Sequence, residues 1–208
     1  MKIDENHLLT GVRQSLIPGG SPMTVRRFLV IHFTAGWTGA SSIDFWKTPA
    51  AKGASAHIVI DRDGTITQCR PFNRTAGHAG VSAWTDPKTG KRYEMLNACS
   101  IGIELANCGD MGALVYPATM GPLARQPIPL IRARHKNGGP LTGWEEYPNA
   151  QLQAADEVGR LLVAKYNLDD VVGHEDIAPN RKNDPGPAFP MTQFRKALGF
   201  TAPLGVRV

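Results

Sequence analysis

The sequence predicts an α/β domain with a mixed central β-sheet flanked by helices. Short apolar runs rich in Val and Ile alternate along the chain with segments of helical periodicity. An Asp-Gly pair separates two of these runs, which indicates a hairpin and makes part of the sheet antiparallel. The 208 residues and a hydrophobic content of 42% suffice for one domain with a substantial core.

The first elements are two strands with a helix between them, followed by a return strand. A buried strand is predicted at 26–35 (RRFLVIHFTA), because the run is short, apolar and followed by a glycine. A helix is predicted at 39–51, capped by its serines and ended by a proline. Its apolar side consists of Ile43, Phe45 and Trp46. The hairpin is predicted at 55–71, with both residues of the Asp-Gly turn at positive φ.

Four further elements follow. A strand is predicted at 97–107 (NACSIGIELAN), where alternation places Glu104 with Gly102 on the face opposite the isoleucines. A long helix is predicted at 149–167, with Asn149 as its cap. A short strand at 168–174 and a last helix at 191–199, ended by Gly199, complete the set.

One segment, 108–148, fits no regular element. It is rich in proline and glycine and contains the basic run RARHKNGG at 132–139. We interpret it as a long insertion over one edge of the sheet, within a single domain that spans 1–208.

Charge and composition limit the classes of partner. The net charge of +5 suits a polyanionic partner, but the basic run lacks interleaved aromatic residues, so we expect no nucleic-acid partner. No apolar stretch approaches the ~18 residues of a membrane span, and the acidic start of the chain is unlike a signal peptide. A cytoplasmic protein is therefore expected. Its three cysteines are expected to be reduced thiols, because nothing supports the alternative of a Cys99–Cys108 bridge.

Polar residues interrupt the apolar strands in a pattern that fits a metal site. His32 lies in a buried strand near its carboxyl end, His174 ends the short strand, and Asp184 follows it on a loop. A lone histidine is more often a hydrogen-bonded core residue. Two histidines and a carboxylate, however, would give zinc three ligands and leave the fourth position open, as in catalytic sites. Glu104 on an inner strand needs a partner or a use, and Lys182 lies on the same loop as Asp184.

Five ordered motifs resemble one known family. They are FLVIHFTA, SAHIVIDRDGTITQ, PFNRTAGHAGVSAW, NACSIGIELAN and GHEDIAPNRKNDPGPAFP. Their order and approximate spacing are similar to those of the zinc-dependent N-acetylmuramoyl-L-alanine amidases of the type-2 family, which share their fold with the peptidoglycan recognition proteins. The resemblance covers about 25–107 and 149–198. It is strongest to the cytosolic branch that recycles anhydro-muropeptides.

The resemblance implies a role for each motif residue. His32, His174 and Asp184 would bind Zn²⁺, Glu104 would be the general base, and Lys182 would stabilise the oxyanion, although the last two roles could be exchanged. For another group, contact with substrate and a purely structural role both stay open: His57, His78, Arg74, Asn97, Trp37 and Trp84. We expect contact with substrate for His78. Ala56 precedes His57 where the phage-lysozyme branch has a catalytic tyrosine, so that tyrosine mechanism does not transfer.

The implied activity is hydrolysis of the amide between N-acetylmuramic acid, or its anhydro form, and L-alanine in peptidoglycan or muropeptides. The alternative is a peptidoglycan-binding module without activity, but such modules have lost a zinc ligand and this chain has all three. The setting could be muropeptide recycling in the cytosol, or release to the cell wall as a phage endolysin. The insertion would form a lid or wall of the site, with Arg132, Arg134 and Lys136 on substrate, or else a solvated excursion.

Overall fold

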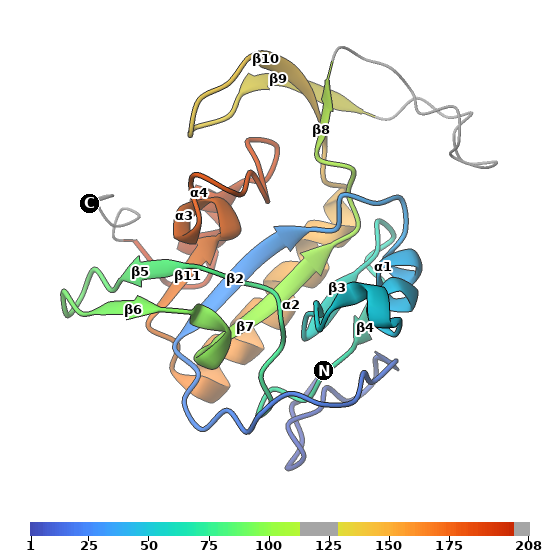
Figure 1. Cartoon of the computed structure of the whole chain (residues 1–208), viewed down its shortest axis with the longest axis vertical. Coiled ribbons are helices and arrows are strands. Elements are labelled where there is room, and N and C mark those ends of the chain that lie inside the picture. The colour runs from blue at the N-terminus through green and yellow to red at the C-terminus, as the bar shows by residue number, and fades with distance from the viewer. Residues whose placement is uncertain (113–128, 202–208) are drawn as a thin grey trace.

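The computed structural model describes residues 1–112 and 129–201. These residues form a six-stranded sheet in the order β1-β4-β3-β7-β2-β11, with a long helix on one face and a short helix, a hairpin and loops on the other (Figure 1). Its strands are β1 (Arg13–Gln14), β2 (Phe28–Phe33), β3 (Ile58–Ile60), β4 (Ile66–Gln68), β7 (Ser100–Leu105) and β11 (Asp170–Gly173). The α-helices are α1 (Gly39–Trp46), α2 (Asn149–Tyr166), α3 (His174–Ile177) and α4 (Met191–Ala197). Two 3₁₀ turns are η1 (Pro49–Ala51) and η2 (Leu96–Ala98), and a separate hairpin pairs β5 (Ala83–Thr85) with β6 (Arg92–Glu94).

The mixed α/β sheet predicted from the sequence is confirmed. Strands β3, β7, β2 and β11 run parallel, so their carboxyl ends meet at one edge, while β4 returns antiparallel to β3. The central pair β2 and β7 is in register from Phe28 opposite Ser100 to Phe33 opposite Leu105. This register places His32 directly beside Glu104.

The two faces of the sheet have different cores. On one face, the isoleucines and leucine of β7 pack with Ala155, Val158 and Leu162 of α2, as the alternation predicted. On the other face, Phe28 and Val30 pack with Trp84 and Leu96. His32, Gly102 and Glu104 belong to this second face by alternation. Trp84 is therefore a core residue, and its indole N–H also donates to Asp170.

Several local expectations were wrong. The hairpin turn has only Gly64 at positive φ (82°). Asp61 O accepts from Gly64 N, and Asp61 N donates to Thr65 O. The chain therefore makes a tight turn that ends at Gly64, and Gly64 adopts the left-handed conformation.

The starts of helices α1 and α2 also differ from the prediction. Thr38, which precedes α1, accepts a hydrogen bond from Ser41 N and is the cap, instead of the serines. On α1, Ile43 is buried, but Phe45 is 48% exposed and does not share its apolar side. Asn149 is the first residue of α2 and Pro148 occupies the cap position.

The insertion forms a second sheet where it is described. Strand β10 (Leu141–Glu145) pairs antiparallel with both β8 (Asp110–Gly112) and β9 (Leu130–Arg134) (Figure 1). The expectation of an irregular segment is therefore wrong for these strands, and 113–128 lie outside the described residues. Arg62 of the main sheet's hairpin makes an ion pair with the buried Glu145, Nε to Oε1 2.6 Å, which ties the two sheets together.

The structure also describes the state of the cysteines and the character of the helices. Cys69, Cys99 and Cys108 are all free, as expected. Within 1–112 and 129–201, no helix has the length and apolar character needed to cross a bilayer.

Candidate metal centre

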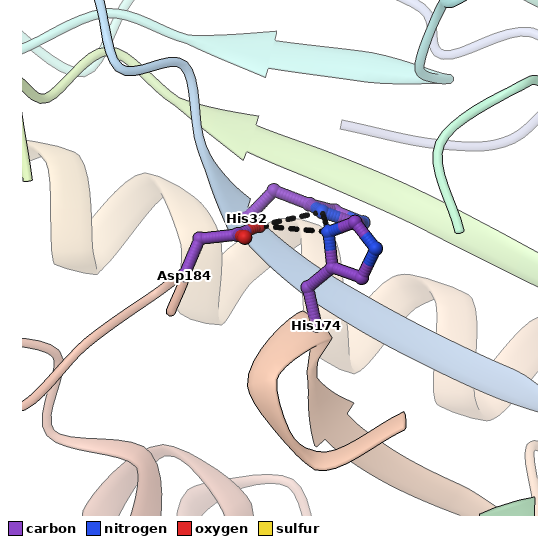
Figure 2. Close-up of side chains that lie close together, drawn as sticks. All are labelled: His32, His174 and Asp184. Carbon is purple, nitrogen blue, oxygen red and sulfur yellow. Dashed lines mark hydrogen bonds and ion pairs between the residues drawn. The ribbon is translucent and has the colours of Figure 1, made fainter. Parts of the chain in front are cut away.

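The three predicted metal ligands meet at the carboxyl edge of the parallel strands. His32 lies near the end of β2, and His174 is the first residue of α3, directly after β11. Because β2 and β11 are parallel neighbours, the two histidines leave the sheet side by side. Asp184 approaches from the loop after α3, and all three side chains point toward one another (Figure 2).

Their polar atoms are within 3.0 Å of one another. Asp184 Oδ2 lies 2.9 Å from His32 Nδ1 and 3.0 Å from His174 Nδ1, and the two Nδ1 atoms are 2.9 Å apart. All three residues are buried. The structure thus brings the predicted ligands together from three separate segments.

The Nε2 atom of His174, which faces away from Asp184, forms a hydrogen bond within the protein. His174 Nε2 lies 3.1 Å from Ala79 O. A carbonyl oxygen can only accept, so Nε2 carries the proton and Nδ1 of the neutral ring is left with its lone pair.

A chain of hydrogen bonds assigns the proton of His32 in the same way. Ser100 Oγ donates to Leu96 O, so it accepts from His78 Nε2, 3.2 Å away. His78 Nδ1 therefore accepts from His32 Nε2 over 3.0 Å. His32 Nδ1 is consequently unprotonated and faces Asp184 and His174.

This donor set fits a metal cation. Two bare imidazole nitrogens and a carboxylate oxygen converge, and three acceptors without a proton between them require a cation. Nitrogen and oxygen ligands of this kind suit zinc. Burial, and then the neighbouring His174, lower the pKa of His32 to about 4, which keeps its ring neutral and able to ligate. Burial opposes ionisation of Asp184, but its close contacts with His174 and His32 lower its pKa below the ordinary range.

Glu104 lies beside this cluster with an unsatisfied oxygen. Its Oε2 is buried and has no hydrogen-bond partner among the described residues. Burial, and then the Asp184 carboxylate, raise the pKa of Glu104 well above its ordinary value, while the positive charge of Lys182 opposes the rise. Lys182 is half-buried, and its positive charge also disfavours protonation of His32.

A groove of about 260 Å³ opens onto Glu104. Its other lining residues are Thr34, Ser41, Ser42, Phe45 and Trp46. Sequence reasoning assigned the aromatic residues of α1 to a packed side and the serines to a cap, and so missed this groove. The signal was the pair of serines beside two aromatic residues on a helix that directly follows the His32 strand.

The remaining motif residues are placed within the protein. His57 is fully buried and accepts from Gly102 N, while its Nε2 donates to Arg74 O, so it braces the sheet. His78 uses both ring nitrogens internally, which favours support of His32 over the expected contact with substrate. Asn97 Oδ1 accepts from the backbone of His78 and Ala79.

Two other side chains lie at the surface. Arg74 is exposed and its guanidinium donates to Gly20 O. Trp37 is partly buried, and the guanidinium carbon of Arg62 lies 4.5 Å from the centre of the Trp37 ring. Contact between substrate and Arg74 or Asn97 stays a prediction.

Known proteins are similar to this chain in sequence and in fold. Residues 21–187 match the model of the N-acetylmuramoyl-L-alanine amidase family. The chain is 33% identical over 150 residues to the 1,6-anhydro-N-acetylmuramyl-L-alanine amidase AmpD of Salmonella typhimurium, covering 71% of this chain and 59% of that protein. The chain therefore spans less than two thirds of the length of this curated relative.

Two solved structures are similar over most of the chain. A crystal structure of an AmpD derivative matches with a TM-score of 0.65 at 27% identity, covering 95% of this chain and 99% of the other. The complex of AmiD from E. coli with the substrate anhydro-N-acetylmuramic acid-L-Ala-D-gamma-Glu-L-Lys matches with a TM-score of 0.61 at 29% identity. The match covers 86% of this chain and 58% of the AmiD chain. By the match over 21–187 and the identity to its relatives, this chain belongs to the N-acetylmuramoyl-L-alanine amidase family.

Proposed function

We propose that the chain is a zinc-dependent amidase that hydrolyses the bond between N-acetylmuramic acid, or its anhydro form, and L-alanine of the stem peptide. The observation that carries this proposal is the convergence of His32 Nδ1, His174 Nδ1 and Asp184 Oδ2 beside an unpartnered glutamate. A binding module without activity would need neither a complete ligand set nor a free buried carboxylate.

The proposed ligands are His32, His174 and Asp184. Zinc bound there would act as a Lewis acid, polarising the scissile carbonyl and making water more acidic. The protein's part is to keep both histidines neutral and oriented. The hydrogen bonds to Ala79 O and His78 do this by holding the protons on the Nε2 atoms.

Glu104 is the proposed general base. Its Oε2 has no hydrogen-bond partner among the residues that the structure describes, so it would be free to take a proton from the attacking water and then to deliver it to the leaving amine. The raised pKa makes this carboxylate a stronger base than an exposed glutamate. Lys182 would hold the negative charge that develops on the carbonyl oxygen.

The proposed substrate is a soluble anhydro-muropeptide. Support comes from the named relatives, which are anhydro-muramyl amidases, and from the AmiD complex with an anhydro-muropeptide. The groove beside Glu104, lined by hydroxyl and aromatic side chains, suits a ligand with both polar groups and apolar surface. The cytoplasmic location expected from the sequence stays a prediction.

The test is hydrolysis of a synthetic anhydro-muropeptide and, in parallel, of purified sacculi. We expect mass spectrometry to detect the free peptide with L-alanine at its new amino terminus, with faster turnover of the soluble substrate. Chelation should abolish the activity and zinc should restore it, whereas an Asp184→Ala variant should not recover with zinc. Full activity in a rigorously metal-free sample would refute the zinc mechanism. Binding without hydrolysis, in protein that holds zinc, would favour the recognition module.

A further inference from the structure

The tip of the β9–β10 hairpin lies against the short helix that carries His174. In Figure 1 the hairpin extends across the top of the molecule and its tip lies above α3. Lys136 Nζ is 2.6 Å from Glu175 Oε1 and 2.7 Å from Asp176 Oδ1, so one ammonium bridges two carboxylates. His135 Nε2 lies 2.5 Å from the other oxygen of Glu175, Oε2.

The next residue of the tip binds backbone atoms of the same helix and of the turn after it. Asn137 Nδ2 donates to Glu175 O over 3.0 Å and to Pro179 O over 3.3 Å. The tip therefore holds α3 through side-chain and backbone contacts. These contacts join segments that are about forty positions apart in the sequence.

Glu175 connects the hairpin tip to the loop that carries Asp184. Its backbone N–H donates to Asp184 O over 2.8 Å, and its Oε2 accepts from Gly186 N over 3.1 Å. One residue next to His174 thus binds the backbone of Asp184 itself and of Gly186 just after it. Its side chain is held by the hairpin tip.

The far end of β10 contacts the same loop. The ring of Trp144 lies so close to Gly186 that a Cβ there would be 2.7 Å from it. Tyr147 OH donates to Pro185 O over 2.7 Å. Trp144 and Tyr147 therefore contact the Asp184 loop directly. The positively charged tip reaches this loop through Glu175.

Charge explains why the tip must be basic. Glu175 and Asp176 are buried, at 4% and 8% exposure, and Glu175 binds the backbone of a third residue with a buried carboxylate, Asp184. Buried carboxylates without a cation repel one another and lose the stabilisation of water. Lys136 supplies that cation to both.

We propose that His135, Lys136 and Asn137 form a clamp that positions His174 and Asp184 for metal binding. This inference rests on the proposed zinc site. It replaces the expected contact between Lys136 and substrate, because the ammonium is already held between Glu175 and Asp176. These residues are positioning residues, since they act through Glu175 and touch neither the metal ligands' polar atoms nor the groove.

The test compares Lys136→Met with a matched control on the same hairpin, Arg134→Met. Each variant loses one positive charge, but the Arg134 guanidinium donates to Gly139 O within the hairpin tip. We expect the amide hydrogens of Glu175 and Gly186 to exchange faster in the full-length, metal-free Lys136→Met protein, and not in the control. Zinc affinity, measured against a competing chelator, should fall about 10- to 100-fold only in Lys136→Met, as for other outer partners of metal ligands. Lys136→Arg, which can still bridge both carboxylates, should restore exchange protection and affinity.

Each result decides the proposal. Equal exchange protection and equal zinc affinity in Lys136→Met and Arg134→Met would overturn it. Unchanged zinc affinity with a raised KM would overturn it in favour of substrate contact. If Lys136→Met does not fold, failure of Lys136→Arg to bind zinc like the parent would contradict it. Hydrogen exchange needs neither metal nor turnover. A protein with the expected difference in exchange protection but without amidase activity would therefore contradict the proposed function and leave the clamp standing.

Discussion

His32 shows how far a single residue can be interpreted from sequence. A histidine inside the run FLVIHF indicates a site, because a buried imidazole needs a partner. The sequence could not show that His78, some forty-six positions away, would be this partner on the side facing away from Asp184. Such pairings depend on how the loop before β5 crosses the sheet, which no local pattern encodes. His78 lies on the far side of the proposed ligand His32, and its expected contact with substrate stays a prediction.

The role of Glu104 is tested by Glu104→Gln. The amide keeps the size of the side chain but cannot take a proton, so kcat should fall by roughly 10²–10⁴-fold, the usual contribution of a general base. Zinc content should be unchanged, since Glu104 is not a proposed ligand. Steady-state kinetics on a soluble anhydro-muropeptide with parallel metal analysis would decide this. Activity within a few-fold of the parent would make Glu104 a structural carboxylate and assign the base elsewhere.

His57 gives a prediction about pH. Burial lowers its pKa to about 4, from 6.5 in an exposed histidine. Above pH 6.5 both folded and unfolded chains hold the neutral ring. Between pH 6.5 and 4 only the unfolded chain takes up the proton, so the free energy of unfolding falls as pH falls. The lowering from 6.5 to about 4 corresponds to a loss of stability on the order of 3 kcal/mol below pH 4.

The comparison variant for this prediction is His57→Gln, which keeps one donor and one acceptor but does not titrate. Denaturant unfolding of metal-free protein from pH 7 to pH 4 should show a smaller loss of stability in the variant than in the parent. An identical pH dependence in the two proteins would mean that His57 is protonated in the folded state or contributes nothing.

At the scale of elements, strong periodicity was predictive. The continuous apolar runs became β2, β3, β7 and β11, and the 3.6-residue period became α2 and α4, because burial on one or two faces leaves those signatures. The site followed from them, since histidines at the carboxyl ends of two parallel strands meet when those strands are neighbours. The sequence did not show that β2 and β11 would be adjacent, and only the resemblance indicated it.

The elements that were missed depend on non-local contacts. Strands β8, β9 and β10 are short, and β8 and β9 have no buried residue. Their sheet is held by the Arg62–Glu145 ion pair and by contacts to α3. None of these leaves a period in the sequence. The cap of α1 was misplaced by a few residues because Thr38 and the serines have the same chemistry and only backbone geometry distinguishes them.

Gly102 on β7 allows a prediction about strand packing. A Cβ at this position would lie 2.5 Å from Cγ of His78 and 2.7 Å from its Nδ1, the atom that accepts from His32. Gly102→Ala must therefore displace the imidazole. We expect a loss of about 1–3 kcal/mol in stability from overpacking and a 10- to 100-fold loss of zinc affinity.

Gly36→Ala is the control for this substitution, because the nearest atom to a Cβ there is 3.6 Å away, an ordinary contact. Chemical denaturation and chelator competition should leave this variant near the parent. A Gly102→Ala protein with parental zinc affinity would show that His78 does not orient His32.

At the scale of the whole molecule, the sheet edge that carries the proposed metal site is enclosed from two sides. The parallel sheet supplies His32 and Glu104, and the second sheet, formed by the insertion, supports the helix and loop that carry His174 and Asp184. The net charge of +5 suggested an anionic partner, yet the basic tip of the insertion binds the protein's own carboxylates. Overall charge therefore says less about this protein's partner than the placement of individual lysines does.

The central claim is that two histidines and one aspartate hold a zinc ion, and X-ray absorption at the zinc edge tests it most directly. Full-length protein with one equivalent of zinc should show two imidazole nitrogens at about 2.0–2.1 Å and oxygen at about 2.0–2.2 Å. His32→Ala and His174→Ala should each lose imidazole scattering or fail to retain the metal. Sulfur scattering at about 2.3 Å, or a spectrum unchanged in both histidine variants, would place the zinc elsewhere and contradict the account.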